Sequence, residues 1–140
     1  MVKKVFLILT ALSILVAVQA QDRYDLFLAR QFAENQEWAK AIEYYNKIIV
    51  DDNSYVEYYE EYNEVLILSK DYKNAEKLIK KVYALQGKDP IYWIDLGLLY
   101  EVQGDTKSRD KYYQKALDEV RSNPYDISKL ANYLIRNNQY

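Results

Sequence analysis

Apolar positions along this 140-residue chain recur at helical spacing and, over longer distances, with a fixed period. Apolar residues in 26–33 and 41–49 fall three and four positions apart, which is typical of amphipathic helices. No stretch alternates apolar and polar residues as a strand would, so we expect an all-helical chain. Equal steps of about 34 residues lead from Leu28 to Tyr62, Leu96 and Leu130. This repeat period predicts an α-solenoid of antiparallel helix pairs, in which each unit buries its apolar face on its neighbours.

Turn-forming residues fall where the period predicts them. Those between successive repeats lie in residues 51–54, 87–90 and 122–124, and those inside the repeats lie in 35–37, 70–71 and 104–105. Asp89–Pro90 and Asn123–Pro124 each place a capping side chain before a proline at a helix start. We therefore predict about three and a half repeats, with bounds near 22–55, 56–89, 90–123 and a partial 124–140. The last repeat would contain a single helix, from Asp126 to Asn137.

Residues 93–100 read Trp-x2-Leu-Gly-x2-Tyr and are followed by Tyr113 and Ala116. This stretch resembles the tetratricopeptide repeat (TPR), a helix-turn-helix unit of about 34 residues. Two positions depart from the family pattern. Asn63 stands where a small residue is usual, and Arg109 stands where alanine is preferred, which we expect to loosen the helix crossing in the third repeat.

The resemblance implies that the first helices of successive repeats line a concave groove that holds a peptide or a segment of another protein. Mapping this face by the repeat phase predicts a groove with a basic, an acidic and an apolar part. Its residues are Arg23, Leu26 and Arg30, then Glu57, Glu60 and Glu64, then Ile91, Ile94 and Leu98.

The acidic part of the predicted groove has helical spacing. Glu57, Glu60, Glu61 and Glu64 follow an i, i+3, i+4, i+7 pattern, which would align four carboxylates along one helical face. Three interpretations stay open: a solvated face, a negative stripe in the groove, and a calcium site. The last is the weakest, because one straight helix cannot wrap the 6 to 8 oxygen ligands that calcium takes.

Residues 1–20 have the pattern of a secretory signal peptide. Lys3 and Lys4 precede an apolar run from Val5 to Val18, and the small residue Ala20 ends a cleavage-like site. Cleavage would make the product periplasmic or secreted, with no membrane span left, whereas an uncleaved segment would act as an anchor. The signal and the tyrosine- and lysine-rich repeats resemble exported TPR proteins of Gram-negative bacteria such as the Bacteroidetes.

Composition argues against several classes of function. The chain has no cysteine and no histidine, so the commonest nucleophile pairs and soft or imidazole metal ligands are missing. A net charge of −2 gives no basic face for nucleic acid. We predict no catalytic, cofactor-binding or metal-binding residues. Most of the 16 tyrosines are expected at interior positions of the repeat, among them Tyr45, Tyr62, Tyr72, Tyr100 and Tyr113. A smaller set, including Tyr55, Tyr58 and Tyr125, is left for an aromatic contact surface.

The function predicted from these patterns is a non-catalytic scaffold for protein–protein interaction, with an unidentified protein or peptide ligand. The alternative is the N-terminal TPR scaffold of a longer protein whose enzymatic or sensory activity lies beyond residue 140. A homo-oligomer that stacks exposed end helices is a third possibility.

Overall fold

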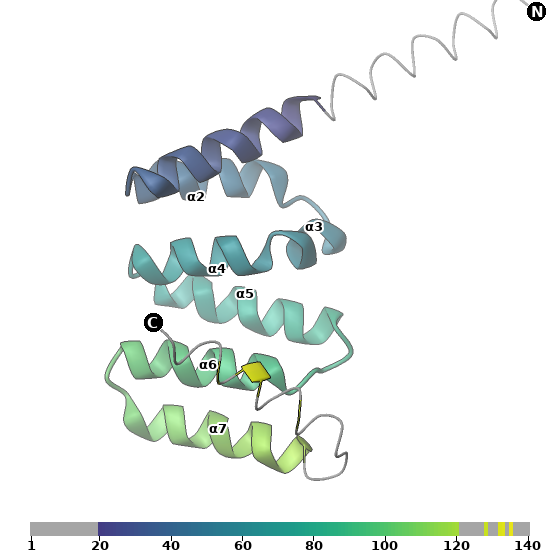
Figure 1. Cartoon of the computed structure of the whole chain (residues 1–140), viewed down its shortest axis with the longest axis vertical. Coiled ribbons are helices and arrows are strands. Elements are labelled where there is room, and N and C mark those ends of the chain that lie inside the picture. Colours follow the sequence, from purple (N-terminus) through teal and green to yellow (C-terminus); the bar gives the residue numbers. More distant parts are fainter. Residues whose placement is uncertain (1–19, 121–127, 129–131, 134, 136–140) are drawn as a thin grey trace, which may run out of the picture. The chain divides into compact units, whose positions relative to one another are not determined.

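The computed structural model describes residues 20–120, 128, 132–133 and 135, and all regular elements in them are helices (Figure 1). The predicted all-helical class is thus confirmed for this part of the chain. The chain divides into two compact units, residues 1–54 and 55–140, here called the N-terminal and C-terminal units. Their boundary falls one residue from the predicted boundary between the first two repeats.

The N-terminal unit contains a helix pair. Residues 20–34 are helical, and after a turn the helix α2 runs over Trp38–Ile48. Gln36 makes the turn possible by adopting the left-handed backbone conformation, with φ of 59°. Ala29 and Ala41 are both fully buried, and the rings of Phe32 and Tyr44 stack with their centroids 5.5 Å apart. Small residues thus allow the two helices to approach, while aromatic rings fill the space beside them.

The first helix of the second repeat starts earlier than predicted. The helix α3 covers Asp52–Glu57, so Asp52 to Ser54 are helical and do not form the expected turn. The cause is a reciprocal cap: the Ser54 backbone N–H donates to Asp51 Oδ1 over 2.8 Å, and the Asp51 N–H donates to Ser54 Oγ over 3.0 Å. This arrangement satisfies donors that a helix start leaves unpaired.

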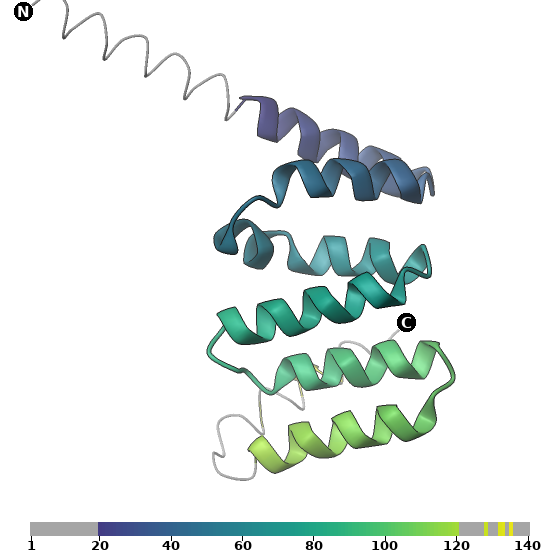
Figure 2. The ribbon, with the colours of Figure 1, turned by 180° about the vertical axis from the view of Figure 1, so that it is seen from behind.

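In its described residues, the C-terminal unit has four longer helices that pack in chain order. They are α4 (Tyr59–Leu68), α5 (Tyr72–Leu85), α6 (Ile91–Val102) and α7 (Thr106–Val120). Figures 1 and 2 show each helix running antiparallel to the next, with α4 against α5, α5 against α6 and α6 against α7. The turns between them lie at the predicted positions 70–71, 87–90 and 104–105.

Aspartates cap three of these helix starts. Asp71 accepts from the Asn74 N–H over 3.3 Å, Asp105 from the Ser108 N–H over 3.0 Å, and Asp89 from the Ile91 N–H over 3.1 Å. Pro90 lies directly before α6, which begins one residue later than predicted. Because capping residues recur along the sequence, the helices begin at correspondingly regular intervals.

The core occupies the same places in successive helix pairs. Ile48, Val82 and Ala116 share one position of the repeat, and each is exposed by 5 % or less. Ala41 and Ala75 are fully buried at another shared position. The second helices α2, α5 and α7 therefore turn the same face inward, and apolar area buried there stabilises the packing by about 25 cal/mol per Å².

Two predicted segments lie largely outside the described residues. They are the signal peptide at 1–20 and the fourth repeat at 124–140, together with the turn at 122–124. In the part of the chain that the structure describes, no helix has the length and apolarity needed to cross a membrane.

Candidate functional site

The acidic residues of the predicted groove lie on two helices. Glu57 ends α3, while Glu60 and Glu64 belong to α4, and all three side chains are exposed. Tyr58 separates the helices with φ of −101° and ψ of 10°, outside regular helical values. The prediction of four carboxylates on one continuous helix is therefore corrected, because the helix breaks after the first of them.

The apolar residues of the predicted groove are more covered than the sequence suggested. Ile91 and Leu98 are half-buried, and Ile94 is only 2 % exposed. Ile94 belongs to a core cluster with Ala116 and Val120 of α7. Its side chain therefore stabilises the helix packing and offers no open surface to a ligand.

Sequence analysis missed two exposed apolar residues on the first helices. Leu68 at the end of α4 is 52 % exposed, and Val102 at the end of α6 is 59 % exposed. They lie one repeat period apart and thus share one repeat position. The signal was present in the sequence, because both residues share one repeat phase that the core positions do not use.

The basic part of the predicted groove lies in the N-terminal unit. Arg23 and Arg30 are exposed and Leu26 is half-buried, all on the helix over residues 20–34. The other residues of the predicted groove belong to the C-terminal unit.

A buried carboxylate on α6 connects three helical segments of the C-terminal unit. Asp95 is 6 % exposed, and its two carboxylate oxygens accept hydrogen bonds from the hydroxyls of Tyr59 on α4 and Tyr133 in the terminal segment. Burial raises the pKa of Asp95 to about 6, while the hydrogen bonds from Tyr133 and Tyr59 act in the opposite direction. Burial, followed by the charge of Asp95, raises the pKa of Tyr59 well above its ordinary value.

Catalytic acids also often have a raised pKa. Asp95, however, is almost closed to solvent, and each of its oxygens already has a tyrosine donor. The geometry therefore indicates a structural role that joins neighbouring helices. No sequence pattern indicated this role, because the two tyrosines lie 36 and 38 residues from Asp95 along the chain.

Tyrosines of the C-terminal unit form a packed aromatic cluster across α5, α6 and α7. The ring of Trp93 lies 4.3 Å from that of Tyr83 and 5.8 Å from that of Tyr112, and Tyr100 stacks on Tyr112 at 5.5 Å. The Lys115 ammonium lies 4.6 Å from the Trp93 ring centre. Such contacts stabilise the packing through ring burial and cation–π attraction.

Burial of the five tyrosines predicted to be interior varies. Tyr45 and Tyr62 are 1 % and 7 % exposed. Tyr72, Tyr100 and Tyr113 are half-buried, as expected for rings that fill a helix interface and extend their hydroxyls to its edge. Of the tyrosines suggested for a contact surface, Tyr55 and Tyr58 are half-buried and Tyr125 lies outside the described residues.

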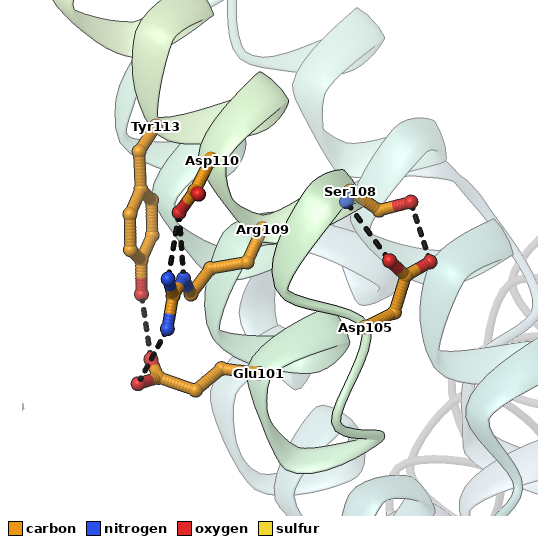
Figure 3. A network of polar contacts seen from close by, with 6 residues as sticks. All are labelled: Glu101, Asp105, Ser108, Arg109, Asp110 and Tyr113. Atoms are coloured by element: carbon orange, nitrogen blue, oxygen red, sulfur yellow. Dashed lines mark hydrogen bonds and ion pairs between the residues drawn. The ribbon is translucent and has the colours of Figure 1, made fainter.

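Arg109, at the alanine position of the third repeat, extends its guanidinium to the surface. It pairs with Asp110 at 2.8 Å and with Glu101 of α6 at 3.7 Å (Figure 3). Glu101 also accepts a hydrogen bond of 2.9 Å from Tyr113 of α7. The pKa of Tyr113 is raised, mainly by burial and then by this bond to Glu101. Arg109 thus takes part in a polar bridge between α6 and α7.

The close crossing of α6 and α7 does not show the loosening that we expected from Arg109. A Cβ atom added at Gly97 of α6 would lie 2.1 Å from the Tyr113 ring, so the ring packs directly on the helix backbone. The glycine therefore permits a close approach that a larger residue would block.

Among the described residues, no cluster of three or more acidic, cysteine or histidine side chains could hold a metal ion. No model of a known protein family matches the chain, and no curated protein resembles it significantly in sequence.

Proposed function

We propose that this chain is a TPR-like solenoid that binds a basic, partly apolar peptide or protein segment on the first-helix face of its C-terminal unit. One observation carries the proposal: at two positions of the repeat, one buried and one exposed, the residues of successive repeats share the same environment. Ile48, Val82 and Ala116 are all buried, whereas Leu68 and Val102 are both largely exposed. A repeated buried face builds the scaffold, and a repeated exposed face is available to a ligand.

The chemistry of this face indicates the kind of segment it would take. Glu57, Glu60 and Glu64 supply exposed negative charge on α3 and α4. Leu68 and Val102 supply exposed apolar surface at the ends of α4 and α6. Complementary charge steers a partner and sets its orientation, and apolar contact adds affinity when water is excluded. The ligand would therefore carry lysine or arginine near one or two apolar side chains.

A peptide library displayed against the immobilised protein tests the proposal. The selected peptides should be enriched in basic and apolar residues. Their capture should weaken as salt is raised, because salt screens exposed charges. The Glu57→Lys, Glu60→Lys, Glu64→Lys triple variant should lose these peptides, and Leu68→Ser with Val102→Ser should reduce their retention.

A matched control reverses three exposed acids on other helices, Glu43, Asp118 and Glu119, all to lysine. This control has the same net charge as the first variant and should still capture the selected peptides. Equal capture by the wild type, the triple glutamate variant and the control would contradict the proposal. A library that yields no enriched sequence would contradict it too. We further propose that the protein acts outside the cytoplasm, with residues 1–20 as its export signal.

A further inference from the structure

Two large aromatic side chains are exposed on the helix over residues 20–34. Tyr24 is 57 % exposed and Phe27 is 55 % exposed, one turn apart on the same face. The opposite side of this helix packs inward, with Ala29 fully buried and Phe32 stacked on Tyr44 of α2. More than half of each aromatic residue therefore stays open to solvent, on the side away from α2.

The repeat itself indicates what kind of surface these positions contact. Two repeat periods lead from Tyr24 to Tyr92 and from Phe27 to Asp95. In the C-terminal unit both of these residues contact α4, the first helix of the preceding repeat. The Tyr92 ring meets Tyr59 edge-on with centroids 5.3 Å apart, and Asp95 accepts the Tyr59 hydroxyl hydrogen bond. The phase of Tyr24 and Phe27 is thus one at which a first helix packs on another first helix.

Terminal repeats of solenoids usually have a polar outer face, which keeps the end of the array soluble. Here the corresponding positions are aromatic, and exposed apolar groups of this kind mark interaction surfaces. We infer that this face binds the same face of a second copy of the chain, so that two helices over residues 20–34 pair antiparallel about a twofold axis at Phe27. A twofold pairing closes on itself and uses one surface twice.

The charges on this helix are consistent with antiparallel pairing. Arg23 and Glu34 are both exposed, and they stand on opposite sides of Phe27 along the helix. At about 1.5 Å per residue, Arg23 lies about 6 Å before Phe27 and Glu34 about 10 Å after it. Antiparallel pairing about Phe27 therefore brings Arg23 of one copy within about 5 Å, along the axis, of Glu34 of the other. Parallel pairing would instead align like charges.

The first experiment measures the mass of the purified full chain by light scattering and sedimentation over about 1–100 µM. Mass spectrometry first establishes which N-terminus the purified protein has. We expect a reversible monomer–dimer equilibrium that Phe27→Glu shifts to monomer, with a dissociation constant raised at least about tenfold. Leu117→Glu, a change at a similarly exposed leucine of α7, should leave the dimer intact. Circular dichroism checks that both variants keep their helix content.

A crosslinking experiment gives a second readout that does not depend on a disruptive variant. Because the chain has no cysteine, Phe27→Cys introduces a single thiol close to the inferred twofold axis. Mild oxidation should give a disulfide-linked dimer with Phe27→Cys and not with Leu117→Cys.

Four results would overturn the inference. These are a monomer mass at every concentration, a mass that grows beyond a dimer, a dimer that Phe27→Glu leaves unchanged, and equal crosslinking of the two cysteine variants. A dimer that Phe27→Glu leaves unchanged would mean that the dimer contact does not involve Phe27. None of these results depends on whether the C-terminal unit binds a peptide.

Discussion

The helix pairs α4–α5 and α6–α7 use the same repeat positions but fill them with different residues. At the position where the first helix crosses the second, α4 has Asn63 and α6 has Gly97. On α7, Tyr113 packs on the glycine backbone, and the residue of α5 at the same repeat position as Tyr113 is Ile79, which is fully buried. The α6–α7 pair thus combines the smallest residue with a large ring, while the α4–α5 pair has an amide and an aliphatic side chain at the same two positions.

The two pairs also differ in their buried polar groups, although each first helix has one buried atom without a hydrogen-bond partner among the described residues, the second being Trp93 Nε1 of α6. Asn63 Oδ1 is buried with no hydrogen-bond partner among the described residues. Asp95 of α6 is buried with two tyrosine donors. A buried polar group without a partner costs free energy, and one with partners can order its surroundings. The comparison teaches that the repeat period fixes the positions at which two helices contact each other. The residues that fill those positions differ from one helix pair to the next.

Among the single substitutions, Gly97→Ala should cost the most stability, because it introduces a Cβ where the α6–α7 pair has no room. The Tyr113 ring must move to relieve a 2.1 Å approach, and such overpacking costs about 1–3 kcal/mol of unfolding free energy. Urea unfolding followed by circular dichroism measures the loss. In a Tyr113→Leu background the same alanine should cost less, since the shorter side chain clears the position. An equal cost in both backgrounds would show that Tyr113 is not the obstacle.

Acidification should raise the unfolding free energy of the chain through protonation of Asp95 on α6. The pKa of Asp95 is about 6 in the folded chain, against 3.8 as its ordinary value, so the folded state binds this proton more tightly. The unfolding free energy should therefore rise as the pH falls through about 6, and level off below about 4, by about 2–3 kcal/mol from this group. Measuring urea unfolding from pH 7.5 to 4 for the wild type and for Asp95→Asn separates this contribution, because the other acids are common to both.

The tyrosine donors give an internal check on the assignment of that pH dependence. Their hydrogen bonds lower the pKa of Asp95, so Tyr59→Phe should move the transition to higher pH. A wild-type pH profile that matches that of Asp95→Asn would refute the role of this carboxylate.

Asn63→Ala should have the smallest effect, and the opposite sign. It removes a buried unpaired oxygen and places at this position the residue found one period earlier, at Ala29. We expect about 1 kcal/mol of added stability, from the lost desolvation penalty and the better helix propensity of alanine. Thermal and urea unfolding would measure it. Lower stability in this variant would mean that the amide has a partner or packing role that the buried oxygen does not reveal.

Local chemistry made several features predictable. The all-helical class, the turns at 35–37, 70–71 and 104–105, and the aspartate caps all follow from residues close in sequence. The inward positions of the second helices were predictable too, because Ala41, Ala75, Ile48, Val82 and Ala116 fall at shared positions of the repeat. The start of α3 and the break at Tyr58 were not, since they depend on the competition between the Asp51–Ser54 cap and the regular helix.

The sequence by itself determined that this chain forms helix pairs and which side of the second helix of each pair faces inward. Only the tertiary structure decided that Ile94 is core, that Leu68 and Val102 are surface, and that Asp95 is held by tyrosines from two other segments. The physical reason is that the sequence period fixes the side of a helix on which a residue lies. Whether that side is buried depends on which residues of another helix pack against it. Tyr24 and Phe27 show this most clearly, because their phase matches Tyr92 and Asp95 while their exposure does not.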